Sequence, residues 1–153
     1  MKAPIVFGLT SLGVLAFACA PRSPAGDAAR KANARQQSAS PRIQASLDVE
    51  PSARRGVDFT FRVSNEGGGK VEMTFPSGQT HDVIVLDSDG REVWRWSEGR
   101  MFTQLLQNKV LRGADTISFR ERWPGATSGR YVAVARLASA NYPVEQRIPF
   151  TVP

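Results

Sequence analysis

Apolar and polar side chains alternate along most of this chain from Arg42 onward, and this feature constrains its fold most strongly. The alternation is strict from Val57 to Val63, and the face that it predicts to be buried carries Val57, Phe59, Phe61 and Val63. A period of two residues is the pattern of a β-strand with one face buried and the other in water. We therefore expect residues 42–153 to form one domain built from strands.

Further segments with strand character are separated by turn-forming residues such as glycine, proline, asparagine and aspartate. The expected strands are 43–49, 57–63, 71–75, 82–86, 92–96, 116–123, 129–137 and 146–152. The run 82–86 is apolar enough for a central strand covered on both faces, whereas Pro149 makes the last strand an edge strand. About seven to nine short strands with turns between them predict an all-β, antiparallel, two-sheet sandwich.

Three local patterns add detail to this prediction. Hairpin turns are expected at 65–69 and at 87–90, with Gly90 at a positive φ. Met101 to Asn108 is the only stretch expected to form a helix, of one or two turns. Tyr131 opens a strand directly after a turn, which matches the tyrosine corner of Greek-key sandwiches, although an ordinary strand tyrosine would give the same pattern.

The first 18 residues, Met1 to Ala18, have the pattern of a signal peptide: Lys2 precedes an uncharged, mostly apolar run that is short for a transmembrane helix. Leu15 to Cys19 is similar to a lipobox, with Ala16 and Phe17 departing from its usual residues. We expect Cys19, the only cysteine, to be the lipidated first residue of a mature lipoprotein in a bacterial cell envelope. The alternative is ordinary cleavage next to Cys19, giving a secreted or periplasmic protein.

Residues 20–41 form a segment rich in alanine, arginine, serine, glutamine and proline, with no aromatic or large aliphatic residue. Such a segment cannot bury enough surface to offset the entropy lost on ordering, so we expect a disordered tether. The formal net charge of the chain is +6, and Lys2 and the tether carry most of it. The domain that follows is therefore close to neutral.

No complete reactive centre can be found in the sequence. The one histidine, His81, lies beside Asp82 and is expected to be structural, and the one cysteine lies in the signal. Neither a catalytic triad nor a metal site can be completed from these residues. The arginines alternate with acids instead of forming the basic face that a nucleic-acid-binding domain needs. We expect no enzyme activity, cofactor, metal or nucleic-acid partner.

The segment Val93 to Trp96 places two tryptophans on one strand face, next to a loop that contains Met101 and Phe102. We interpret Trp94, Trp96, Trp123 and Tyr131 as structural or core residues. The alternative is a recognition surface, since tryptophan, phenylalanine, methionine and arginine are frequent at protein interfaces.

Several of these segments resemble the BsuPI family, which is named for an intracellular proteinase inhibitor of Bacillus. The likeness is carried by Ser77-Gly78-Gln79, Asp82 to Leu86, Asp89 to Ser97, Gly99 to Gln104, Leu111-Arg112-Gly113, Phe119, Trp123 and Gly129-Arg130-Tyr131. It extends over about residues 45–140, with His81 where the family usually has tyrosine. The resemblance implies an immunoglobulin-like sandwich that binds a protein partner, with a serine protease as the candidate.

If the chain inhibits a protease, physical requirements indicate where the protease would be contacted. A substrate-like inhibitor needs an extended loop that loses little entropy on binding, and the loop 97–104 is the first candidate, with Arg100, Met101 and Phe102. Arg100 would suit a trypsin-like pocket, and Met101 or Phe102 a subtilisin-like one. The turn with Ser77, Gly78 and Gln79 is the second candidate.

Two other functions remain open. One is a non-inhibitory adhesion or assembly module that binds an envelope protein through an exposed sheet edge. The other is a carbohydrate-binding module that uses an exposed Trp94 or Trp96 as a stacking platform. In each case we expect membrane contact only through the lipid anchor.

Overall fold

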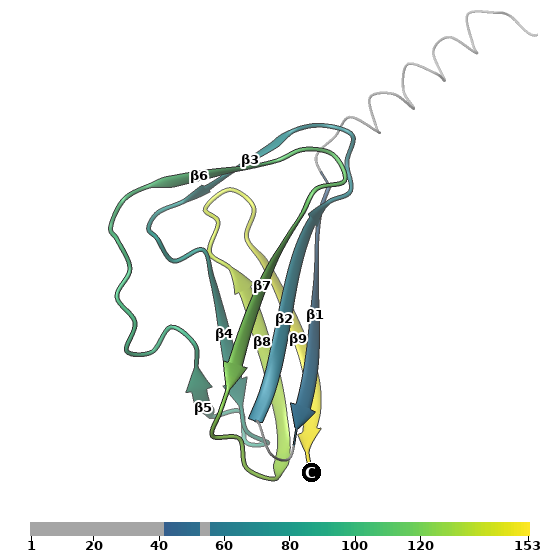
Figure 1. Ribbon diagram of the computed structural model, residues 1–153, viewed down its shortest axis with the longest axis vertical. Helices are drawn as coiled ribbons and strands as arrows, with labels where there is room; N and C mark the ends of the chain where they lie inside the picture. The colour runs from purple at the N-terminus through teal and green to yellow at the C-terminus, as the bar shows by residue number, and fades with distance from the viewer. Residues whose placement is uncertain (1–41, 53–55) are drawn as a thin grey trace, which may run out of the picture.

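The computed structural model describes residues 42–52 and 56–153, and within these residues it is all-β. The nine strands, drawn in Figure 1, are β1 (Ile43–Ser52), β2 (Gly56–Asn65), β3 (Val71–Phe75), β4 (His81–Leu86), β5 (Glu92–Arg95), β6 (Gln107–Leu111), β7 (Thr116–Trp123), β8 (Gly129–Leu137) and β9 (Val144–Val152). All of their pairings are antiparallel. The predicted immunoglobulin-like sandwich is confirmed.

Two sheets form the layers of the sandwich. One has the order β1-β2-β7 and the other the order β5-β4-β8-β9. The predicted face of β2 is buried, with Val57, Phe59, Phe61 and Val63 at most 1% exposed. Phe59 meets rings from the opposite sheet: its centroid lies 5.8 Å from that of Trp94 and 6.1 Å from that of Phe150. The alternation of β2 therefore supplies one half of a shared apolar core.

The central and edge strands lie where the sequence predicts them. Residues His81 to Val85 of β4 are all buried, and β9, with Pro149, is the outermost strand of its sheet. β1 and β9 pass side by side, which brings the first and last strands together (Figure 1). Gly90 has a φ of 79° in the turn between β4 and β5. The hairpin predicted at 87–90 is therefore present.

The turn at 65–69 corrects one prediction. It is not a hairpin, because β2 does not pair with β3: β3 and β6 form a separate two-stranded sheet at one end of the molecule (Figure 1). Asn65, fully buried, fixes the crossing, since its side-chain NH₂ donates to the carbonyls of Gly69 at 2.6 Å and Leu111 at 3.2 Å. Turn chemistry marks where a strand ends but does not determine which strand is its partner.

The helix predicted over Met101 to Asn108 is wrong. Residues 101–106 have no regular secondary structure, and the chain then enters β6, which pairs with β3 from Val71↔Leu111 to Phe75↔Gln107. Methionine, leucine and glutamine favour a helix locally. Pairing with β3 instead satisfies the backbone over several residues and buries Leu111, so tertiary contacts override the local preference.

The signal peptide, Cys19 and the tether predicted for residues 1–41 lie outside the described residues. Within the part that is described, no helix is long and apolar enough to cross a membrane.

Candidate functional site

The longest irregular connection after residue 56 joins β5 to β6 and contains the first predicted contact site. We call residues 96–106 the β5–β6 loop. It leaves the edge of the four-stranded sheet and runs along one side of the molecule to the β3–β6 sheet (Figure 1). Because the loop connects two different sheets, its shape depends on how its two ends are attached.

The first end is held by Asp82, a residue of β4 that is only 7% exposed. Its carboxylate accepts hydrogen bonds from the backbone N–H and the hydroxyl of Ser97, at 3.2 and 2.9 Å, and from Arg95 at 2.8 Å. Arg95 also bonds Glu92, and these contacts, the one with Glu92 foremost, raise the pKa of the guanidinium. The carboxylate therefore ties the start of the loop to the centre of the sheet.

The second end is held by the turn that carries the second predicted site. The backbone N–H of Gly78 donates to the carbonyl of Thr103 at 2.8 Å. A Cβ at Gly78 would lie 2.6 Å from the hydroxyl oxygen of Thr103, so a larger residue would displace the Thr103 side chain. Ser77 and Gln79 close the turn through an N–H···O bond of 3.2 Å. The two candidates, 97–104 and 76–80, thus form one continuous surface.

Trp96 forms the floor beneath the middle of the loop. Its ring is stacked on His81, with centroids 4.2 Å apart, and His81 is stacked in turn on Phe119 at 4.1 Å. The guanidinium carbon of Arg100 lies 4.6 Å from the centroid of Trp96, and its Nε donates to the Trp96 carbonyl at 2.8 Å. The ring of Phe102 lies 5.7 Å from Trp96. Arg100 and Phe102 are therefore both engaged with the tryptophan.

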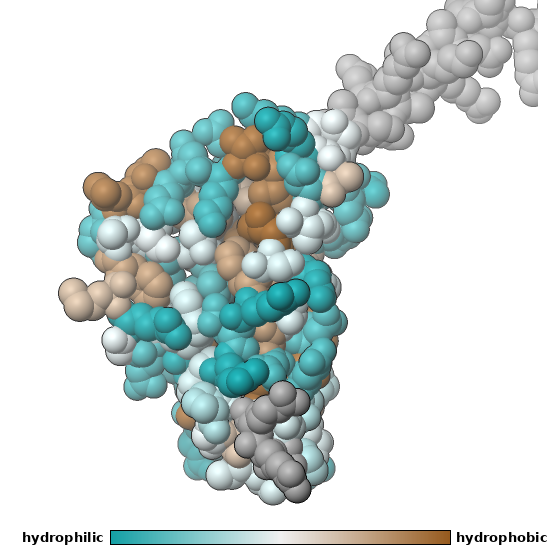
Figure 2. Space-filling view, in the orientation of Figure 1, coloured by the Kyte–Doolittle hydropathy of each residue, from teal (hydrophilic) through white to brown (hydrophobic). Residues whose placement is uncertain are grey.

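Met101, between these two residues, is free. Its side chain is 99% exposed, and Leu105 and Leu106 follow at 70% and 67%. These three are the most exposed large hydrophobic residues in the described part of the chain. Figure 2 shows hydrophobic residues along the side where Figure 1 draws the loop. The loop presents an apolar apex on a framework of polar and aromatic contacts.

A buried acid–base pair lies behind Trp96. Nε2 of His81 is 3.0 Å from a carboxylate oxygen of Glu121 on β7. Burial lowers the pKa of His81 to about 4, helped by the positive charges of Lys109 and Arg100 and opposed by Asp82. Burial also raises the pKa of Glu121. The imidazole is therefore uncharged at neutral pH.

The predicted structural residues lie in two aromatic groups. Trp123 is buried, and Trp94 and Tyr131 are half-buried against it, with centroids 6.4 and 5.1 Å from that of Trp123. The Tyr131 hydroxyl donates to the carbonyl of Thr127 at 3.0 Å, as a tyrosine corner does. Trp96 belongs to the second group, beneath the β5–β6 loop.

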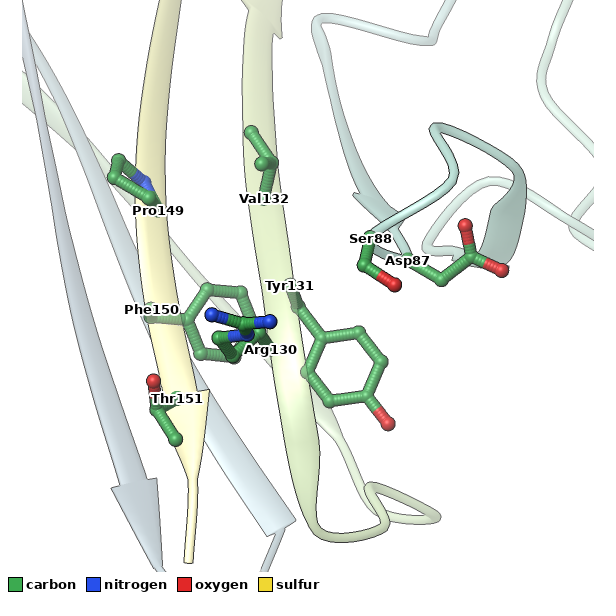
Figure 3. Close-up of a pocket in the computed structure, with 8 residues that line it drawn as sticks. All are labelled: Asp87, Ser88, Arg130, Tyr131, Val132, Pro149, Phe150 and Thr151. Atoms are coloured by element: carbon green, nitrogen blue, oxygen red, sulfur yellow. The ribbon is translucent and has the colours of Figure 1, made fainter.

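A hollow lies elsewhere on the domain, between β8, β9 and the β4–β5 turn. It has a volume of about 300 Å³. Figure 3 shows Tyr131, Pro149 and Phe150 along the strands, with Asp87 and Ser88 on the turn beside them. Of the predicted residues only Tyr131 reaches it. No group of three or more metal-ligating side chains gathers within residues 42–52 and 56–153.

A family model described as BsuPI, intracellular proteinase inhibitor, matches residues 43–142. The chain belongs to the BsuPI family. The match begins with β1 and includes both ends of the β5–β6 loop, the Trp96 floor and the Gly78 turn. The surface described above is therefore part of the BsuPI domain and not an addition to it.

Comparison with other proteins adds little to this assignment. A search of curated proteins gives no match. Similar solved structures include a CARDB domain from Pyrococcus furiosus, in complex with di-metal ions (16% identity, TM-score 0.42, 74% of this chain and 89% of that one). Others are the sporulation control protein Spo0M from Bacillus subtilis (13%, 0.40, 72% and 49%) and β-glucosidase 3B from Thermotoga neapolitana (11%, 0.39, 71% and 16%). Such low scores support no functional argument for the BsuPI domain.

Sequence reasoning missed several residues of this surface. The sequence predicts a helix at Leu105 and Leu106, and their exposure follows only from the irregular path of the loop. The role of Asp82 was missed because its partners lie 13 and 15 positions away. The apolar run that follows His81, which opens β4 ahead of four other buried residues, is the signal in the sequence that its ring is buried.

Proposed function

We propose that this BsuPI domain inhibits a serine protease by binding it through the surface that the β5–β6 loop and the 76–80 turn form together. Family membership supports proteinase inhibition in general terms. The observation that supports this particular surface is Met101, 99% exposed at the apex of a loop whose two ends are fixed by hydrogen bonds.

Attachment at both ends matters because a binding loop loses conformational freedom when it docks. Each side chain or segment that is already held in place reduces this entropic cost. The Asp82 contacts hold one end, the Gly78–Thr103 bond holds the other, and Trp96 supports the middle. The described domain contains no cysteine, so these contacts take the place that disulfides have in many small inhibitors.

The geometry also favours one type of specificity pocket. A trypsin-like pocket would have to draw Arg100 away from the Trp96 ring and carbonyl. Met101 can enter an apolar pocket of the subtilisin-like type with no such rearrangement, and Leu105 and Leu106 would add apolar contact next to it. We therefore place Met101 in the target's primary pocket and assign Arg100 and Phe102 to holding the loop.

An inhibition panel with subtilisin-like and trypsin-like proteases tests the proposal. Met101→Asp is compared with Val93→Asp, a control on β5 that also places a charge at an exposed apolar position, 44% exposed. We expect the wild type and the control to inhibit a subtilisin-like protease equally, and Met101→Asp to be at least about tenfold weaker. Equal inhibition by both variants would mean that the loop is not the contact.

We further propose that the domain is exported and held at a bacterial envelope membrane by lipid on Cys19. The lipobox-like residues before this cysteine, and the polar segment after it, support this placement. Mass spectrometry of the mature N-terminus tests it: a diacylated and N-acylated cysteine is expected, and Cys19→Ser should release the protein from the membrane fraction. An unmodified N-terminus next to Cys19 would instead mean a secreted or periplasmic protein.

One edge of β7 supports a second candidate function, a module that binds an envelope protein. This strand pairs with β2 on one side and, in the described residues, with no strand on the other. A free edge of this kind could accept an extended segment of an envelope protein. If no protease in the panel is inhibited, this binding module becomes the better assignment. Carbohydrate stacking is disfavoured, because His81 and Arg100 both lie against the ring of Trp96.

A further inference from the structure

The exposure of the methionines differs to an extreme degree. The chain has three, of which Met1 lies outside the described residues. Met73, on β3, is 0% exposed within the core, whereas Met101 is 99% exposed. A dissolved oxidant can therefore reach the sulfur of Met101 without any opening of the fold, and it can reach that of Met73 only after unfolding.

We propose that Met101 is an oxidation site through which peroxides switch off binding to the protease. In the reaction, a lone pair of the thioether sulfur attacks one oxygen of the peroxide. The O–O bond breaks, an S–O bond forms and water leaves. The sulfur loses two electrons to the peroxide and becomes a sulfoxide. A dithiol-dependent sulfoxide reductase reverses the change, since the sulfoxide oxygen leaves as water while the dithiol becomes a disulfide.

The effect on binding rests on the proposed function, which places Met101 in an apolar pocket. A sulfoxide is polar and accepts hydrogen bonds, so burying it against apolar walls costs free energy that the thioether does not. The two adjacent residues cannot take its place, because Arg100 and Phe102 are held against Trp96. The fold itself should not respond, since a side chain that is 99% exposed contributes little to packing.

The test treats the folded full-length chain with hydrogen peroxide and removes the peroxide with catalase before adding protease. Cys19→Ser is present in every sample, so that no thiol competes. Peptide mapping is expected to find one added oxygen on Met101 and none on Met73. Inhibition of the subtilisin-like protease should fall by about tenfold or more, and a methionine sulfoxide reductase with dithiothreitol should restore it.

Two variants identify the residue responsible, each compared with its own untreated sample. Met73→Leu should lose inhibition on treatment as the wild type does, and Met101→Leu should show no change. Full inhibition by protein whose Met101 is completely oxidised would overturn the inference and leave the proposed function intact. Oxidation of Met73 as fast as Met101 would also overturn it. A lack of inhibition before any treatment would instead refute the proposed function, and this inference with it.

Discussion

Replacing Asp82 with alanine is expected to destabilise the domain by about 3 kcal/mol, although the residue lies outside the proposed contact surface. The side chain is nearly buried and accepts hydrogen bonds from Ser97, Arg95 and the Val83 N–H. The substitution leaves the N–H groups of Val83 and Ser97 without this acceptor, and unpaired buried groups cost about 1–3 kcal/mol each. Arg95 keeps its bond to Glu92, which limits the loss.

Urea denaturation measures this effect. For a small domain, about 3 kcal/mol corresponds to a fall of roughly 1.5 M in the unfolding midpoint with an unchanged slope. Asp89→Ala is the matched control, because that carboxylate is 63% exposed and bonds only an exposed arginine. The control should change stability by less than about 0.5 kcal/mol.

A double-mutant cycle with Ser97→Ala shows whether the loss arises at the start of the loop. Ser97→Ala removes the hydroxyl bond to Asp82 and keeps the backbone N–H bond. Because that hydroxyl bond is lost in either single variant, the double variant should be more stable than additivity predicts by about 1 kcal/mol. Asp82→Ala should also weaken inhibition, since the loop loses its first attachment. An unfolding midpoint equal to that of the control would refute the role given to Asp82.

Three further predictions concern other parts of the domain. Gly78→Ala should destabilise the domain by about 1–2 kcal/mol and weaken inhibition, because its Cβ would clash with the Thr103 side chain. An unfolding midpoint equal to that of the wild type would contradict the role given to the contact between Gly78 and Thr103. Burial lowers the pKa of His81 to about 4, so as the pH is lowered the unfolded chain binds a proton before the folded domain does. The free energy of unfolding should therefore fall by at most about 3 kcal/mol between pH 6.5 and pH 4. The raised pKa of Glu121 acts in the opposite sense, and His81→Gln, which keeps Glu121, should lack the fall when urea midpoints are compared across this range. Ala114 has a φ of 68°, a left-handed conformation that is strained for alanine and relaxed for glycine. Ala114→Gly should therefore stabilise the domain by about 1 kcal/mol and raise its melting temperature. A lower melting temperature would contradict this.

The strands and their core residues could be predicted from the sequence wherever one face of a strand is buried. In β2 the alternation identifies the four core residues, because a shift by one position would expose all of them. In β4 the continuous apolar run matches a strand whose first five residues are all buried. These patterns are local, so they can be read without knowing which strands pair.

Pairing and loop geometry were not accessible in the same way. The pairing of β3 with β6 joins residues more than thirty positions apart. The local preference of residues 101–108 indicates a helix instead. The contact between His81 and Glu121 spans 40 positions. Likewise, the sequence predicts Arg100, Met101 and Phe102 together as contact residues. Only the position of Trp96 shows that Arg100 and Phe102 pack against its ring while Met101 does not.

Hydrogen exchange on a complex with an inhibited subtilisin-like protease tests most directly whether the β5–β6 loop is the binding surface. The account predicts slower exchange, relative to the free domain, in peptides from residues 97–106 and 76–80, and unchanged exchange in the turn 87–91. Protection of β7 or of the 87–91 turn, with the β5–β6 loop exchanging as in the free protein, would contradict it.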